Sequence, residues 1–91
     1  MKFIYDTTPV SQIAWVKRAI YIGDYVIRIV FDDGHEQAVD FKAFLKTSSH
    51  PIVRKYLNEK KFLAFRIIHG NLNWNDYEMI FPLEKLYNGK I

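Results

Sequence analysis

Two turn signals divide the stretch from Ile13 to Asp40 into three runs rich in β-branched and aromatic residues. Asp33-Gly34 is typical of a type I′ turn, and Gly23-Asp24, with glycine in the first position, is typical of a type II′ turn. Turns of these kinds join neighbouring antiparallel strands. The pattern therefore predicts a three-stranded meander, around which we expect the rest of the chain to pack.

The turns also predict which residues share each face of this sheet. With a two-residue turn at Gly23-Asp24, Ile22 faces Tyr25 and Val16 faces Phe31 on a side that we expect to be core. The same side carries Arg18, Ile20, Ile27 and Ile29. Continued through Asp33-Gly34, this register adds two acids to the apolar side, Glu36 and Asp40. Acids are not expected in a core, so we expect either that these two lie at the edge of the sheet or that a bulge shifts the register.

The opposite face of the predicted sheet mixes aromatic and basic side chains, which suits a binding surface. Trp and Arg are enriched among the residues that dominate protein interfaces, and aromatic rings on a sheet can also stack nucleic-acid bases. The candidate contact residues for a protein partner are Trp15, Lys17, Tyr21 and Arg28. We expect Trp15 to be partly buried and Arg28 to be exposed. Alternatively, other elements cover this face and Trp15 is a core residue.

The remaining segments predict short helices and a second hairpin. Phe41–Lys46 has the apolar spacing of a helix with Asp40 as N-cap, and Pro51 suits the first position of a helix that runs to Glu59. Strands are predicted over residues 2–5, 62–68 and 72–74, and a helical turn over 82–87. We expect a single α+β domain: an antiparallel three-stranded meander, two short helices, a second β-hairpin and a short C-terminal helical turn.

Composition narrows the class of protein. The 91 residues are 49% hydrophobic and contain no cysteine, which argues against disorder and excludes disulfides and thiolate chemistry. No apolar run reaches the roughly 18 residues that a membrane span requires, and no signal peptide is recognisable. We expect a soluble cytoplasmic protein without membrane contacts.

Patterns for catalysis or metal binding are missing from the sequence. The three histidines, His35, His50 and His69, fall in three separate predicted loops, whereas such sites need groups that converge. Asp32-Asp33 suits a turn, since adjacent side chains point apart. We expect no catalytic residue, no metal ligand and no cofactor.

Basic residues are concentrated in the middle of the chain. The segment Lys42–Arg66 holds seven Lys or Arg residues against one acid, Glu59. On the second predicted helix Arg54, Lys55 and Lys61 lie away from the apolar stripe, so they form a candidate contact surface for nucleic-acid phosphates. The alternative is a solubilising face.

An ordered set of short features resembles a known family. Phe31-Asp-Asp-Gly34, Val39-Asp40-Phe41, a strand from Phe62, an isolated Trp74 and a closing Leu86-Tyr87 are similar to small bacterial domains of the domain-of-unknown-function family 2442, DUF2442. Members tend to carry Pro after the Trp, whereas Asn75 stands here. We interpret Trp74 as a packing anchor against Leu86 and Tyr87.

The resemblance implies a compact α+β domain without an established activity. Some members are encoded beside a second small protein, in pairs suspected of being toxin and antitoxin. We therefore expect a non-enzymatic module that binds a protein partner, in the manner of an antitoxin, and as the alternative a nucleic-acid-binding or transcription-regulating domain.

Overall fold

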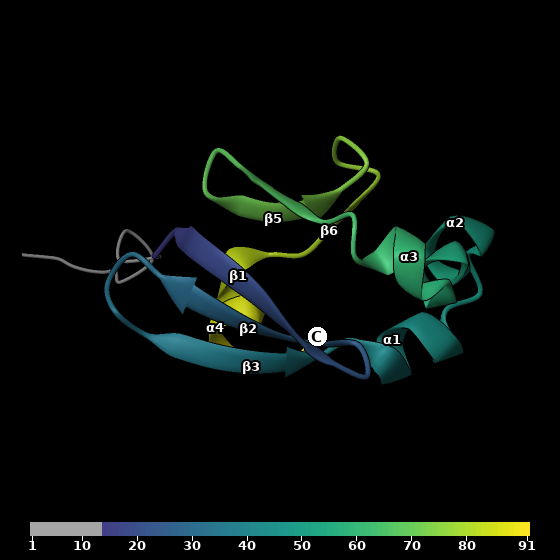
Figure 1. Ribbon diagram of the computed structural model, residues 1–91, viewed down its shortest axis with the longest axis horizontal. Coiled ribbons are helices and arrows are strands. Elements are labelled where there is room, and N and C mark those ends of the chain that lie inside the picture. The colour runs from purple at the N-terminus through teal and green to yellow at the C-terminus, as the bar shows by residue number, and fades with distance from the viewer. Residues whose placement is uncertain (1–13) are drawn as a thin grey trace, which may run out of the picture.

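A computed structural model describes residues 14–91, which form two three-stranded antiparallel sheets and four short α-helices (Figure 1). The first sheet contains β1 (Val16–Gly23), β2 (Val26–Phe31) and β3 (Glu36–Asp40), and the second contains β4 (Arg66–Ile68), β5 (Asn71–Trp74) and β6 (Met79–Ile80). The predicted strand over residues 2–5 lies outside the described part. The α+β class and the meander are confirmed.

The first turn lies one residue later than predicted. Asp24 and Tyr25, with φ angles of 52° and 65°, form the two-residue turn, and Gly23 pairs with Val26. Bulges between Val16 and Arg18 and between Tyr21 and Gly23 shift the β1 register. As a result Tyr21 pairs with Ile27 on the inner face, and the predicted core residue Ile20 pairs with Arg28 on the outer face.

Two tyrosines explain this shift of register. The Tyr21 ring packs edge-on against Phe62, with ring centroids 5.9 Å apart, and its hydroxyl donates a 2.6 Å hydrogen bond to Glu59. Tyr25 also packs on Phe62, and its hydroxyl donates to the Leu57 carbonyl. These long-range contacts outweigh the local preference for glycine at the first turn position.

The second turn contains three residues rather than two. Phe31 N–H donates to the His35 carbonyl over 2.8 Å, and Gly34 has a φ of 92°, as a three-residue hairpin with a glycine bulge requires. Of the two expected outcomes for Glu36 and Asp40, the shift of register is the one observed. Val39 then pairs with Ile27 in the core, and both acids lie on the outer face.

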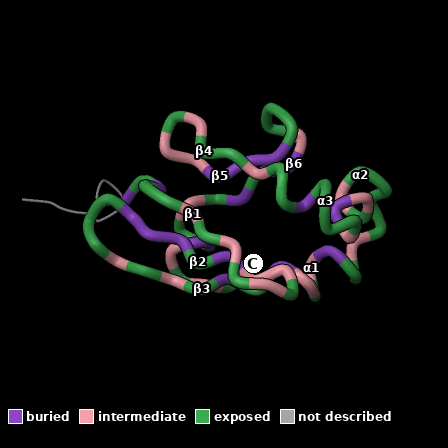
Figure 2. The backbone as a smooth tube through the Cα atoms, viewed as in Figure 1, coloured by how far each residue is buried: buried purple, intermediate pink, exposed green. Residues whose placement is uncertain are grey.

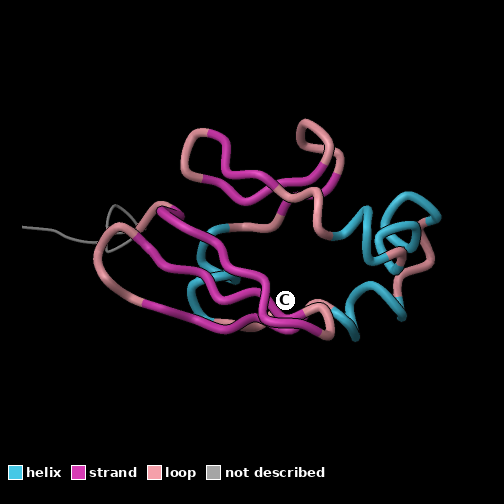
Figure 3. The backbone as a smooth tube through the Cα atoms, in the orientation of Figure 1, coloured by secondary structure: helices cyan, strands magenta, loops and turns pink. Residues whose placement is uncertain are grey.

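The helices gather at one end of the molecule, apart from α4, which lies behind the first sheet (Figures 1 and 3). Helix α1 (Lys42–Thr47) begins one residue later than predicted, with Phe41 rather than Asp40 as N-cap, and the Asp40 carboxylate accepts from Lys42 N–H over 2.9 Å. Residues 51–62 form α2 (Pro51–Arg54), a 3₁₀ turn (Lys55–Leu57) and α3 (Glu59–Phe62).

The second predicted helix is therefore interrupted. Asn58 has an extended backbone, with φ −72° and ψ 113°, and its side chain caps α3 by accepting from Lys61 N–H. Ile52 near the start of α2 is 52% exposed, so this apolar side chain does not belong to the core. Phe62 ends a helix instead of starting a strand, and β6 was not predicted. We refer to residues 51–62 as the helical arm.

One hydrophobic core joins both sheets and the helices. Trp74 is fully buried, as expected for a packing anchor, and its Nε1–H donates to the Phe62 carbonyl over 2.7 Å. Its ring meets the rings of Phe41, Tyr56, Phe62, Phe65 and Phe81. Buried residues run along β2 and β5 (Figure 2).

The C-terminal helix α4 (Leu83–Asn88) covers the inner side of the first sheet. Leu86 belongs to the core that contains Trp74, as predicted. The expectation for Tyr87 was wrong, because its ring stacks on His35 at 4.0 Å and packs on Phe31. Its hydroxyl donates to Asp33, so α4 holds the β2–β3 turn.

The two sheets meet at one end of β1. Val16 N–H donates to the Gly70 carbonyl in the β4–β5 turn over 2.8 Å, and the Trp15 side chain lies against Gly70. No helix within residues 14–91 combines the length and hydropathy needed to cross a bilayer.

Candidate functional site

The four residues predicted to share a partner-binding face do not lie together. Arg28 lies on the outer face, half exposed, with its Nε 3.8 Å from the Glu36 carboxylate. Tyr21 lies on the inner face. Lys17 sits in a bulge, and Trp15, 51% exposed, lies beside Gly70. The bulges in β1 are the reason, since a shift of one residue exchanges the faces of a strand.

The outer face of the first sheet nevertheless combines apolar and charged residues. Cross-strand pairs place Arg18, Val30 and Glu36 in one row, Ile20, Arg28 and Ala38 in the next, and Val26 with Asp40 in the last. We call these eight residues the outer sheet face. Arg28 occupies the middle of this face, with Arg18, Glu36 and Asp40 at its corners. Ile20 is 39% exposed, whereas Val30 is buried.

The predicted basic surface is also divided. Lys55 and Lys61 line a cleft, whereas Arg54 is exposed but is not part of the cleft wall. The Lys55 ammonium lies 2.6 Å from the Glu78 carboxylate. Arg54, Lys55 and Lys61 therefore do not form one free basic face.

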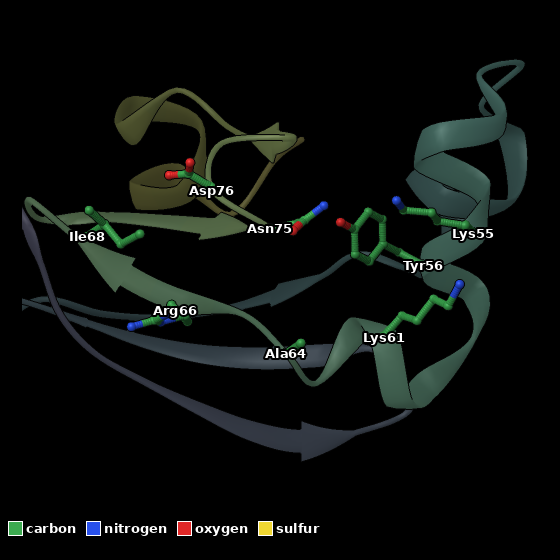
Figure 4. A pocket seen from close by; sticks show the side chains of 8 residues that line it. All are labelled: Lys55, Tyr56, Lys61, Ala64, Arg66, Ile68, Asn75 and Asp76. Carbon is green, nitrogen blue, oxygen red and sulfur yellow. The ribbon is translucent and has the colours of Figure 1, made fainter.

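The cleft lies between the helical arm and the second sheet and has a volume of about 490 Å³ (Figure 4). One wall comes from the helical arm and the segment after it, and contains Lys55, Tyr56, Lys61 and Ala64. The other wall comes from the second sheet, and contains Arg66, Ile68, Asn75 and Asp76. Small-molecule sites typically occupy 300–1,000 Å³. We refer to this feature as the basic cleft, since it has three basic residues and one acid.

Glu78 bridges the two walls of the basic cleft. Its Oε1 accepts from the Tyr56 hydroxyl over 2.6 Å and from Asn75 Nδ2 over 3.2 Å, and it pairs with Lys55. Lys55, Tyr56 and Asn75 together lower the pKa of Glu78 to about 2. Burial, together with the hydrogen bond to Glu78, raises the pKa of Tyr56. Glu78 is therefore charged and Tyr56 neutral at physiological pH.

The β5–β6 turn holds an unfavourable backbone conformation beside the cleft. Asn75, Asp76 and Tyr77 have φ angles of 49°, 55° and 71°. Asn and Asp tolerate this left-handed region better than other side-chain-bearing residues, so Tyr77 carries most of the strain. The Glu78 contacts hold this turn against the helical arm.

The histidines do not form a site. His35 Nε2 lies 3.0 Å from the Tyr87 carbonyl oxygen and the ring stacks on Tyr87, which is a packing role. Among residues 14–91, no group of three or more His, Asp or Glu is placed to hold a metal ion.

Sequence reasoning missed the residues that the second sheet brings to the cleft. Arg66 interrupts the apolar run 62–68, and a lone charge within such a run was the available signal. Asn75 and Asp76 carried no signal, because the wall they form depends on a turn whose second strand was not predicted.

These features define a class of small α+β domain with two antiparallel sheets, an outer sheet face of mixed apolar and charged residues, and a basic cleft. A family model described as "Protein of unknown function (DUF2442)" matches residues 16–91, so the chain belongs to the DUF2442 family. Comparison with curated proteins and with solved structures returned no match.

Proposed function

We propose that this chain is a non-catalytic interaction module that binds a protein partner through the outer sheet face. The observation that carries the proposal is the composition of this face, in which the exposed Ile20 and Ala38 and the half-buried Val26 lie beside the exposed Arg28. Val30 in the same face is buried. Arg28 stands in the middle row of the central strand with apolar neighbours beside it, and arginine is enriched among the residues that dominate protein interfaces.

The face itself, rather than the edge strand β1, is the proposed contact. Two bulges and the charges of Lys17 and Arg18 mark this edge, and bulges and charges are the devices that discourage addition of another strand. Side chains that project from the sheet are not affected by this protection.

A different protein fits this face better than a second copy of the chain. Three strands about 4.8 Å apart, with about five residues of 3.3 Å each, present roughly 250 Å². A standard interface buries about 800 Å² per partner, so two flat copies cover too little surface. A partner of another shape can extend from the face to the exposed Ile22 and Trp15.

The family resemblance supports a paired role, in which the partner is the small protein encoded beside this one and this chain neutralises it. Nucleic-acid binding through Arg54, Lys55 and Lys61 has less support, because Lys55 is engaged by Glu78 and Arg54 lies outside the basic cleft.

The test begins with the coding neighbourhood, where the proposal expects a small adjacent gene. The purified chain is then titrated with the product of that gene, and binding is measured by calorimetry. Ile20→Asp and Arg28→Ala should each weaken binding by about 2 kcal/mol or more, the threshold for a dominant interface residue. Lys46→Ala, exposed on α1, is the control and should bind as the wild type does.

Lack of binding by the wild type, or unchanged affinity in both sheet variants, would contradict the proposal. Concentration-dependent dimerisation that Ile20→Asp abolishes would instead identify a second copy as the occupant. Gel shifts at low salt test the nucleic-acid alternative, and wild-type binding that Arg54→Glu, Lys55→Glu and Lys61→Glu together abolish would favour it.

A further inference from the structure

We propose that the basic cleft binds a small organic phosphate monoester, with Lys61 and Arg66 contacting the phosphate. The inference does not depend on partner binding, because the residues of the cleft and those of the outer sheet face are different. Either proposal can fail while the other holds.

The cleft is held open by bonds that need no ligand. Figure 4 shows Tyr56, Lys55 and Asn75 directed toward one another across the gap between the helical arm and the second sheet. Glu78 joins all three, which fixes the distance between the walls. Preformed walls avoid part of the ordering cost of binding, and only the side chains that contact the ligand remain to be ordered.

The free charges of the cleft favour an anion. Lys55 is compensated by Glu78, but within residues 14–91 neither Lys61 nor Arg66 forms an ion pair. Arg donates several N–H groups in a fixed fork that matches phosphate, and Lys adds a mobile point charge. Figure 4 shows the Lys61 and Arg66 side chains well apart and pointing in different directions. Both are exposed, so a bound phosphate has to draw them together.

The remaining lining indicates an organic body attached to the anion. Ala64 and Ile68 offer apolar surface, and Asn75 and Asp76 offer hydrogen-bonding groups for hydroxyls or amines. Inorganic phosphate would leave these contacts and most of the 490 Å³ volume unused.

The acid in the cleft wall argues against an extended polyanion. Asp76 in the wall would repel the further phosphates of a nucleic-acid strand, whereas the charge of Glu78 is compensated by Lys55. The strained turn from Asn75 to Tyr77 supports a ligand-binding role, because such strain is concentrated at functional sites.

The test uses NMR amide shifts of the whole chain with three phosphate monoesters: adenosine monophosphate, glucose 6-phosphate and phenyl phosphate. Each is compared with its unphosphorylated parent and with inorganic phosphate. We expect saturable shifts in residues 61–66 and 75–76 for at least one monoester, and affinity at least about tenfold lower for its parent and for inorganic phosphate.

Substitution of the two proposed phosphate-binding residues tests whether they contact the ligand. Lys61→Ala and Arg66→Ala should each weaken the monoester by about tenfold, the effect of losing one charge-assisted hydrogen bond. Lys46→Ala removes the same charge outside the cleft and should leave affinity unchanged.

Three results would overturn the proposal. The first is that no monoester saturates the chain below about 10 mM. The second is that the unphosphorylated parent binds as tightly as its monoester, and the third is that Lys46→Ala weakens binding as much as Lys61→Ala and Arg66→Ala do. Binding of a single-stranded oligonucleotide alone, with steep salt dependence, would replace it by the nucleic-acid function.

Discussion

Gly34 is the residue whose backbone conformation decides the β2–β3 turn. Its φ is 92°, and a Cβ built there meets no atom within 4 Å, so any cost of substitution comes from the backbone. Gly34→Val should lower the free energy of unfolding by about 1–3 kcal/mol, measured by chemical denaturation. Gly34→Asn should cost less, since Asn tolerates positive φ better. Equal stability of wild type and Gly34→Val would contradict the turn.

Gly70 differs from Gly34 because space is also restricted. A Cβ on Gly70 would lie 2.6 Å from Cε3 of Trp15, and the φ is 78°. Gly70→Ala should therefore destabilise more than Gly34→Ala. In a double-mutant cycle, Trp15→Ala should recover about 1 kcal/mol of the loss, the size expected for two residues in contact. Additive effects of the two substitutions would show that Trp15 does not rest on Gly70.

At the scale of elements, Glu78 connects the 3₁₀ turn to the β5–β6 turn through a pH-dependent contact. Its folded pKa of about 2 lies below the ordinary value of 4.5, because Lys55, Tyr56 and Asn75 stabilise the carboxylate. This stabilisation is complete above about pH 4.5 and is lost as the pH falls toward 2.

The melting temperature should consequently fall across this window. Glu78→Gln should melt lower than the wild type at pH 7 and lose less on acidification. Part of the acid dependence should remain in the variant, because the His35 N–H and the Tyr87 hydroxyl also lower the pKa of Asp33. An identical acid dependence in wild type and Glu78→Gln would contradict the bridge.

Local signals predicted the elements better than the boundaries between them. Pro51 at a helix start and Gly34 at positive φ follow from backbone sterics alone, and both were found. The β1 register and the end of α3 depend on Phe62, whose ring packs against Tyr21 and Tyr25. Contacts of this sequence separation leave no periodic signal. The cleft was unpredictable for the same reason, since its walls come from separate segments.

At the scale of the whole molecule, both sheets and the helices should unfold together, because they share one core. Leu86 on α4 is fully buried within it, so Leu86→Ala should cost about 2–5 kcal/mol of unfolding free energy. Denaturation followed by circular dichroism should remain a single transition. Two separated transitions would show that the sheets are independent units.

The two tryptophans differ in burial, so their intrinsic fluorescence should report on two different parts of the structure. The Trp74 indole is enclosed by aromatic rings and hydrogen-bonded to a carbonyl, whereas Trp15 is half exposed where the sheets meet. Native emission should therefore contain a short-wavelength component that quenchers cannot reach and a long-wavelength component that they can. If the two emission components are followed separately during unfolding, one experiment distinguishes opening of the junction between the sheets from loss of the core.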